Sequence, residues 1–401
     1  MRISTAQFHQ QNLGNILQRQ SNTSKIMEQI ATGKRVNTAG DDPVASVAID
    51  NLKQQNKLTD QYLKNIDYAK NHLAQTESHL GNAENIGRSL KDQMLSVLNG
   101  THTDAERQTI AKKMRSDLEA LQQVANSRDE SGNYFFSGFK TDQQPFEFSG
   151  SSPRSISYKG DDGVRNSVVA EGVVLGSNVS GSRAFMDGKN ALGDYSAKYS
   201  ANQSGKFQIS EAKIANSSAH VAANYSINFV DNGSGGINVE VKNGSNTVLA
   251  ATPFDPKNPI SFNGVEVKID GTPKAGDSVG ISPQANTNIF DTVEKTIALL
   301  EKGNVQSEAG KAELAQQLNN LNQGINQIGL ARSEAGVSLQ NSESYITRHQ
   351  DTKLANKEAL SKLEDLDTAK AITDLNREQL ALKAASSVYT KVSNTSLFDF
   401  I

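Results

Sequence analysis

Apolar side chains recur in alternating steps of four and three residues over a long stretch near the start of the chain. Of 15 positions on this spacing, 11 are apolar, which is typical of a helix with a coiled-coil seam. Asp42 and Pro43 predict an amino-terminal cap, and Asn99-Gly100 predicts the end. We therefore expect one helix over 43–98, about 80 Å long at about 1.5 Å per residue. The positions are Ala48, Leu52, Gln55, Thr59, Tyr62, Ile66, Ala69, Leu73, Thr76, Leu80, Ala83, Gly87, Leu90, Met94 and Val97.

A shorter helix follows. Thr103 and Glu106 form a capping-box pattern. We expect an antiparallel return helix, because the same spacing continues at Ala111, Met114, Leu118, Leu121 and Ala125.

The last third of the chain has the same helical character. The spacing of Phe290, Val293, Ile297 and Leu300 predicts a short helix, which ends at Gly303. A long seam follows, loosens over 347–358 and resumes near the carboxyl end. Such stripes fit either core packing within one bundle or packing between subunits, and the pattern favours neither. The seam positions are Leu314, Leu318, Leu321, Ile325, Ile328, Arg332, Ala335, Leu339, Ser342 and Ile346, then Ala371, Leu375, Glu378, Leu382, Ala385, Tyr389 and Val392.

Residues 1–40 differ from both flanks because they are rich in Gln, Asn, Ser and Thr. Their apolar positions are scattered, such as Leu13, Leu17, Met27 and Ile30. A helix this polar is marginal alone. We expect it to become ordered on assembly, opposite the amphipathic helix at the other terminus.

The centre of the chain predicts antiparallel β structure. It holds seven of the eight prolines and 17 of the 30 glycines, all between 141 and 285, and this shift marks a domain boundary on either side. Apolar and polar residues alternate with the period of strands, and turn signals separate the strands. We expect a sandwich or a small barrel. The strands are 207–209, 225–230, 237–241 and 265–269, and the turns are Asp231-Asn232-Gly233, Asn243-Gly244 and Asp270-Gly271.

The predicted fold class is therefore a multidomain α+β protein, in which a long coiled-coil-like helical bundle from both termini carries an inserted antiparallel β domain. The predicted segments are a terminal assembly segment (1–42) that pairs with a carboxyl-terminal assembly helix (360–401), the two halves of a helical domain (43–140 and 286–359) and the β insertion (141–285).

Composition narrows the possible functions. The absence of cysteine excludes disulfides and thiolate sites. A net charge of -3 gives no positive field for nucleic acid or an anionic membrane. Mean hydropathy is -0.53, and no stretch approaches the roughly 18 apolar residues of a membrane span. The first 20 residues lack the apolar core of a secretory signal, so we expect any export to use another route.

No motif of enzyme chemistry is present. The histidines form no H-E-x-x-H pair, no phosphate-binding glycine loop opens a helix and no G-x-S-x-G elbow occurs. His72 and His79 are seven residues apart and could share a helix face, but a surface or seam position is the commoner role. We expect no enzymatic activity, no cofactor and no metal site.

Four segments together resemble the flagellin family. The first, IATGKRVNTAGDDPVASVAI (30–49), is similar to the turn that leads from the family's amino-terminal segment into its first long helix. The second is SGNYFFSGFKTDQQPF (131–146). The third comprises 158–187 and 260–281, which resemble β-domain segments of hook-associated members, and the fourth is the closing stretch 363–401. Residues 187–224 match nothing, and we expect them to form a lineage-specific surface.

Within the family, two features favour a hook–filament junction member over a filament subunit. Flagellins usually lack the proline-aromatic pair that ends segment 131–146, and they usually end in a leucine-arginine pattern. This chain instead ends in Leu397, Phe398, Asp399, Phe400 and Ile401. We interpret the four apolar residues at this end as an assembly surface, although they could fold back onto the monomer's own bundle.

The resemblance implies an extracellular structural adapter of the flagellum, exported through the flagellar type III pathway without a cleaved signal peptide. Implied partners are hook-associated protein 1 on the hook side, flagellin on the filament side, further copies of the chain in a ring, and an export chaperone. The predicted assembly interface is Leu13, Leu17, Ile30, Arg35, Asn37, Asp41, Asp42, Pro43, Leu375, Leu382, Tyr389, Leu397, Phe398, Phe400 and Ile401.

Two other functions remain open. A minor flagellin would share the helical flanks and differ mainly at 131–146 and at the carboxyl terminus. A secreted binding module, or adhesin, would use the β insertion to bind a glycan or another surface ligand.

Overall fold

The computed structural model describes residues 5–393, which form two compact units. The terminal unit combines the chain up to residue 64 with the chain from residue 344 onward, and the central unit spans 65–343. Both divisions fall inside the longest helices, α2 (Pro43–Asn99) and α5 (Glu308–Glu364). The sequence pattern instead predicted segment boundaries close to the ends of these helices. The apolar pattern shows where a helix ends, but it does not show where along the helix the packing partners change.

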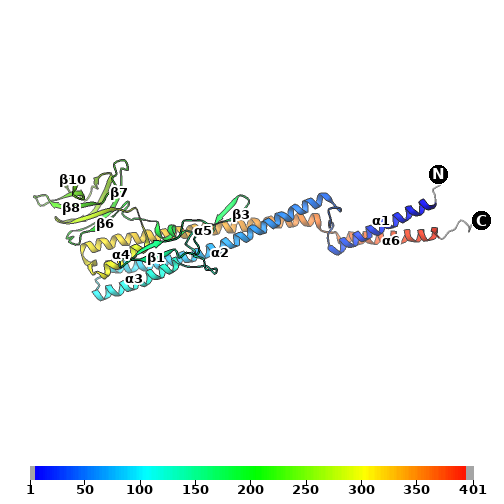
Figure 1. The fold of residues 1–401 in the computed structure, drawn as a ribbon, viewed down its shortest axis with the longest axis horizontal. Coiled ribbons are helices and arrows are strands. Elements are labelled where there is room, and N and C mark those ends of the chain that lie inside the picture. Colours follow the sequence, from blue (N-terminus) through cyan, green and yellow to red (C-terminus); the bar gives the residue numbers. More distant parts are fainter. Residues whose placement is uncertain (1–4, 394–401) are drawn as a thin grey trace, which may run out of the picture. The chain divides into compact units, whose positions relative to one another are not determined.

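The terminal unit is helical. Helices α1 (Thr5–Thr32) and α6 (Thr368–Ser393) lie side by side (Figure 1). Asp367 caps α6, because its Oδ1 accepts a hydrogen bond from the Lys370 amide at 3.0 Å. The end of α5 lies against the start of α2 in the same unit.

In the central unit the predicted seam of α2 is correct. Every position on the four-and-three spacing from Ile66 to Val97 is buried. Ion pairs flank the seam between α2 and α5, with Lys70 Nζ 3.1 Å from Glu343 Oε1 and Arg332 Nε 2.6 Å from Glu77 Oε1. The α2 and α5 stripes therefore pack within one chain here.

At the start of α2 the predicted seam is wrong. Ala45 and Ile49 are the buried side chains, whereas Ala48 is only half-buried and Gln55 is exposed. Ala45 and Ile49 share a small core with Val36 from the preceding turn. Because the turn covers one side of α2 at its start, the residues on that side are the ones that are buried.

The shorter helices agree with the sequence. Helix α3 (Asp104–Ala125) starts at the Thr103–Glu106 capping box, and its five predicted apolar positions are buried. Helix α4 (Ile289–Glu301) buries its four predicted positions, and Gly303 follows it in the left-handed region with φ +72°. A single 3-10 turn, Asn304–Gln306, leads into α5.

The rest of the central unit is antiparallel β structure. One sheet has the order β10-β9-β8-β13-β6 and a second the order β11-β12-β7, while β1-β2, β3-β4 and β5-β14 are separate pairs. A five-residue π-helix, Ser182–Met186, precedes β5. The strands are β1 (Phe146–Ser149), β2 (Ser155–Tyr158), β3 (Asn166–Ala170), β4 (Val173–Gly176), β5 (Gly188–Lys189), β6 (Tyr195–Tyr199), β7 (Lys206–Ile214), β8 (Tyr225–Asp231), β9 (Ile237–Asn243), β10 (Asn246–Pro253), β11 (Ile260–Phe262), β12 (Val265–Thr272), β13 (Ser278–Pro283) and β14 (Asn286–Thr287).

The two larger sheets share one core, which confirms the inserted antiparallel β domain. The four predicted strands correspond to β7, β8, β9 and β12. The expectation that 187–224 forms a surface is wrong for its first part, because Tyr195, Tyr199 and Phe207 are buried in that core, whereas 214–224 is mostly exposed. A lack of resemblance in sequence did not mean a lack of structural constraint.

The turn predicted at Asp270-Gly271 is also wrong. Gly271 lies inside β12, opposite Phe207 of β7. Its φ is +103°, and a Cβ at this position would meet the Lys206 carbonyl oxygen at 2.1 Å. The glycine is needed for close approach of two strands and not for a reversal of the chain.

Candidate assembly interface

A short turn joins α1 to α2 in the terminal unit. Gly33 ends α1 in the left-handed conformation with φ +69°, where a residue with a Cβ is strained. Its carbonyl accepts a hydrogen bond from the Leu366 amide at 3.0 Å. A β-bridge between Lys34 and Asp365 lies beside it. The turn is therefore fixed to the segment between α5 and α6.

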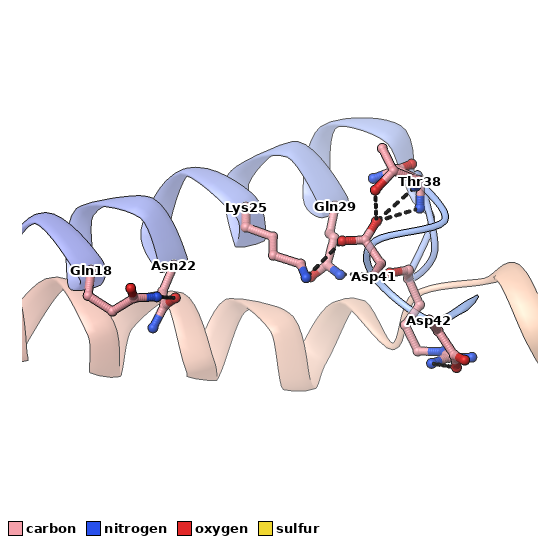
Figure 2. A network of polar contacts seen from close by, with 9 residues as sticks. Gln18, Asn22, Lys25, Gln29, Thr38, Asp41 and Asp42 are labelled. Atoms are coloured by element: carbon pink, nitrogen blue, oxygen red, sulfur yellow. Dashed lines mark hydrogen bonds and ion pairs between the residues drawn. The ribbon is translucent and has the colours of Figure 1, made fainter. Parts of the chain in front are cut away.

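Asp41 holds the loop of this turn together (Figure 2). Its Oδ2 accepts hydrogen bonds from the amides of Asn37 at 3.0 Å and Thr38 at 2.9 Å, and from the Thr38 hydroxyl at 3.2 Å. Its Oδ1 lies 2.7 Å from Lys25 Nζ on α1. The hydrogen bonds from Lys25 and the Thr38 amide hold the pKa of Asp41 far below its usual range.

Asp42 and Arg35 join the turn to α2 and α5. Asp42 Oδ1 accepts from the Ala45 amide at 3.0 Å and so caps α2 ahead of Pro43. This bond, followed by the one from Arg35, lowers the pKa of Asp42. The Arg35 guanidinium donates to Asp42 Oδ2 at 3.2 Å and to the Leu363 carbonyl at 2.9 Å.

Glu364, at the end of α5, forms ion pairs with two lysines beside the turn. The residue is only 8% exposed, and its Oε1 pairs with Lys34 and with Lys53 of α2, the latter at 3.1 Å. Burial by itself raises the pKa of Glu364, but the hydrogen bonds from Lys34 and Lys53 outweigh it and leave the pKa lowered. The Arg35 amide also donates to the Glu364 carbonyl at 2.7 Å.

Polar and ring contacts are part of the packing between α1 and α6. Arg19 pairs with Glu378 at 3.2 Å, and the rings of His9 and Tyr389 meet edge to face with centroids 5.7 Å apart. Thr23 is the one side chain of α1 that is buried among the described residues. Such a pair has little apolar core of its own.

Large apolar side chains of this unit are instead exposed. On α1, Leu13 is 48% and Leu17 57% exposed, one helical turn apart. On α6, Leu380 is 70% exposed, and Val44 in the first turn of α2 is 82% exposed. The other exposed members are Met27, Val47, Leu58, Leu354, Ile372 and Val388. Several large exposed apolar side chains in one helical unit are typical of a surface that packs against another chain.

The predicted interface residues fall into three groups. Arg35, Asn37, Asp41, Asp42 and Pro43 come together in the turn, where they act on the chain's own fold. Along the helix pair, two predicted positions are exposed and four are half-buried: Leu13 and Leu17, then Ile30, Leu375, Leu382 and Tyr389. Leu397, Phe398, Phe400 and Ile401 lie outside the described residues.

The sequence reasoning missed Val44, Val47, Ile372, Leu380 and Val388. On α6, Ile372 directly follows the predicted seam position Ala371 and Val388 directly precedes Tyr389, so the two lie on different sides of the seam. The sequence prediction used one stripe of apolar positions on each helix, so apolar side chains outside that stripe were not included.

His72 and His79 are packing residues of the central unit. Their rings pack on Phe135, with centroids 4.7 and 5.0 Å away. Burial, followed by the charge of Arg165, lowers the pKa of His72 to about 4. Over residues 5–393, no cluster of side chains suited to a metal ion is found. Within that same range no helix is both long and apolar enough to cross a membrane.

Comparisons with known proteins show which proteins this chain resembles. The family model of the bacterial flagellin N-terminal helical region matches residues 3–141. Flagellar hook-associated protein 3 of Salmonella typhimurium is 24% identical over 402 residues, and that of Escherichia coli K12 is 26% identical over 402 residues; each alignment covers 99% of both chains. These findings confirm the resemblance to the flagellin family, whose members are structural proteins of the flagellum and not enzymes.

Within that class, the resemblance is to flagellar hook-associated protein 3 along nearly the whole chain. A crystal structure of the flagellar junction protein from Legionella pneumophila has a TM-score of 0.66 and 28% sequence identity. It covers 79% of this chain and 100% of its own. The long helices and the antiparallel β domain are thus the architecture of a solved relative.

Proposed function

We propose that this protein is the adapter subunit of the hook–filament junction, assembled as a ring between hook-associated protein 1 and the flagellin filament. The proposal rests on the apolar side chains that α1, α6 and the start of α2 expose in the single chain. Full burial of one such side chain is worth about 1.5–3 kcal/mol. Repeated between neighbouring subunits around a ring, the burial of these side chains would supply the free energy of assembly.

A junction role, as opposed to a filament role, is supported by the Pro145-Phe146 pair. Phe146 is fully buried, and its ring packs against Phe185 and Phe290 with centroids 5.5 and 5.4 Å away. Asn126, just beyond α3, accepts a hydrogen bond from the Phe146 amide at 2.9 Å. The pair that flagellins usually lack is thus part of the core that joins the helices to the β domain.

We further propose that the chain reaches the cell exterior through the flagellar type III pathway, without a cleaved signal peptide and with an export chaperone. Helices that bury few apolar side chains within the monomer tolerate passage as an extended chain. The chaperone would cover the apolar positions of α6 until assembly.

Deletion of the gene tests the proposal. Cells without the protein should carry hooks without filaments and release flagellin monomer into the medium, and a plasmid-borne copy should restore filaments. If the deletion strain keeps its filaments, the junction role is wrong. Filaments of altered shape or composition would then identify a minor flagellin, and loss of surface attachment by fully motile cells would identify an adhesin.

A further inference from the structure

Four asparagines in this chain are followed directly by glycine: Asn99, Asn232, Asn243 and Asn263. An Asn-Gly step is chemically labile, since glycine has no side chain to keep its backbone nitrogen from approaching the asparagine carboxamide. Folding decides which steps react, because hydrogen bonds that hold either the carboxamide or the glycine amide prevent that approach. The four steps differ sharply in this respect.

Two of the steps are held by the glycine amide. The Gly100 amide donates to the Ser96 carbonyl at 2.9 Å at the end of α2. The Gly233 amide donates to Asp231 Oδ1 at 2.9 Å. The carboxamide oxygen of Asn232 also accepts from the amides of Ser234 and Gly236, both at 2.8 Å.

The step at Asn263 is held from both sides. Its carboxamide nitrogen donates to the Tyr225 hydroxyl at 3.3 Å. The carbonyl of Gly264 accepts from the amides of Ala215 and Asn216 at 2.9 and 3.0 Å. This turn therefore has little freedom to rearrange.

Asn243 is different. It closes the hairpin between β9 and β10, opposite Asn246, and the two residues between them are exposed. Gly244 has φ +59°, and nothing lies within 4 Å of the position of its absent side chain. Within residues 5–393, no hydrogen bond holds either the Asn243 carboxamide or the Gly244 amide.

We propose that Asn243 is the preferred site of spontaneous deamidation in the folded protein. The Gly244 nitrogen attacks Cγ of Asn243 and loses its proton to water. The Cγ–Nδ2 bond breaks, and the amide nitrogen takes up a proton from water and leaves as ammonia, so that a cyclic imide remains. Water opens the imide at either carbonyl and gives aspartate or isoaspartate, with no oxidant or reductant involved.

The product adds one negative charge at the edge of the five-stranded sheet. When isoaspartate forms, it also lengthens the backbone at the pair that closes the hairpin. Both changes accumulate with time and without an enzyme. Old and new copies of the protein would therefore present different surfaces on β10.

Trypsin separates the four steps into peptides 92–107, 214–242, 243–257 and 258–268. The full-length protein is incubated in mildly alkaline buffer, and the deamidated fraction of each peptide is followed by mass spectrometry. Peptide 243–257 should react several-fold faster than the other three. Incubation in denaturant should bring the four rates together, because the hydrogen bonds that protect the other three steps are then lost.

Asn243→Gln serves as the matched variant, because peptide 243–257 also contains Asn246. The variant should abolish the fast reaction in this peptide and leave the other three rates unchanged. If another of the Asn-Gly peptides reacts as fast as 243–257 in the folded protein, the proposal is overturned. The same holds if the variant peptide still deamidates at the original rate.

Discussion

Lys25 of α1 places its ammonium nitrogen 2.7 Å from Asp41 Oδ1 in the following turn. The helix is thereby tied to the loop that reverses the chain, and the same carboxylate holds the loop through the amides of Asn37 and Thr38. Asp41 thus helps to fix the position of α1 relative to the start of α2.

Asp41→Asn should loosen α1 without unfolding the central unit. Asparagine can accept fewer hydrogen bonds and loses the ion pair with Lys25, at a cost of about 1 kcal/mol. Backbone hydrogen exchange in α1 should become several-fold faster, while α3 and α4 stay protected. Asp351→Asn, at an exposed position of α5, is the control and should leave hydrogen exchange unchanged in α1 and in α3 and α4. Equal protection of α1 in both variants would show that Asp41 does not hold the turn.

The buried seam of α2 should not tolerate charge. Leu73 is 1% exposed, and Leu73→Asp buries an unpaired carboxylate, which should destabilise the central unit by several kcal/mol, on the order of the cost of such a charge. Ala74→Asp adds the same charge at the next, exposed position. Thermal unfolding should separate the variants by many degrees. If their midpoints coincide, the seam is assigned to the wrong face.

His72 makes the stability of the central unit depend on pH. Its pKa is lowered from 6.5 to about 4 in the folded protein, so the unfolded chain binds more protons between these values. Stability must therefore fall as the pH drops from about 6.5 toward about 4. Urea unfolding across this range should show the fall, and His72→Gln should make it smaller, while His79, whose pKa is also lowered by burial, keeps its part. A wild-type curve that is flat, or that rises toward acid, would contradict the burial of a neutral His72.

The carboxylates of the turn act at lower pH. The pKa values of Asp41, Asp42 and Glu364 are lowered, so they stabilise the terminal unit above their ordinary values of about 4. This contribution is lost as the pH falls through the lowered values. Proteolysis of α1 with an acid-active protease should accelerate below about pH 4, and less so in Asp41→Asn. Constant resistance down to strongly acidic pH would argue against this linkage.

Sequence pattern predicted the helices of this fold better than the strands. The seam from Ile66 to Val97 and the capping box at Thr103 follow from spacing and cap chemistry, which are local. The strands β6 and β13 were missed because their burial depends on pairing with each other, far apart in sequence. Gly271 shows the same limit. Glycine is required there because the Lys206 carbonyl of another strand leaves no room for a Cβ.

The candidate interface was predicted in part for a similar reason. The turn residues Arg35 to Pro43 were recognised through family resemblance, and the structure assigns them contacts within the chain. Leu13 and Leu17 were found as the scattered apolar positions of a polar helix. Leu380 and Val44 escaped because each lies outside the main stripe of its helix, and only the fold shows which side is covered.

The most direct test of the assembly proposal separates folding from assembly. A Leu13→Glu/Leu17→Glu variant changes two exposed side chains of α1, and Gln11→Glu adds charge at an exposed polar position of the same helix. Both proteins should melt as the wild type does. In the deletion strain, the control should restore filaments, and the leucine variant should be exported while flagellin is lost to the medium.

The quantity to measure is therefore the number of filaments per hook in cells that produce each variant, beside the melting midpoint of the purified monomer. The account predicts that the leucine variant has a wild-type midpoint and few or no filaments. Wild-type filament numbers in those cells would contradict it, because the exposed row on α1 would then have no part in assembly.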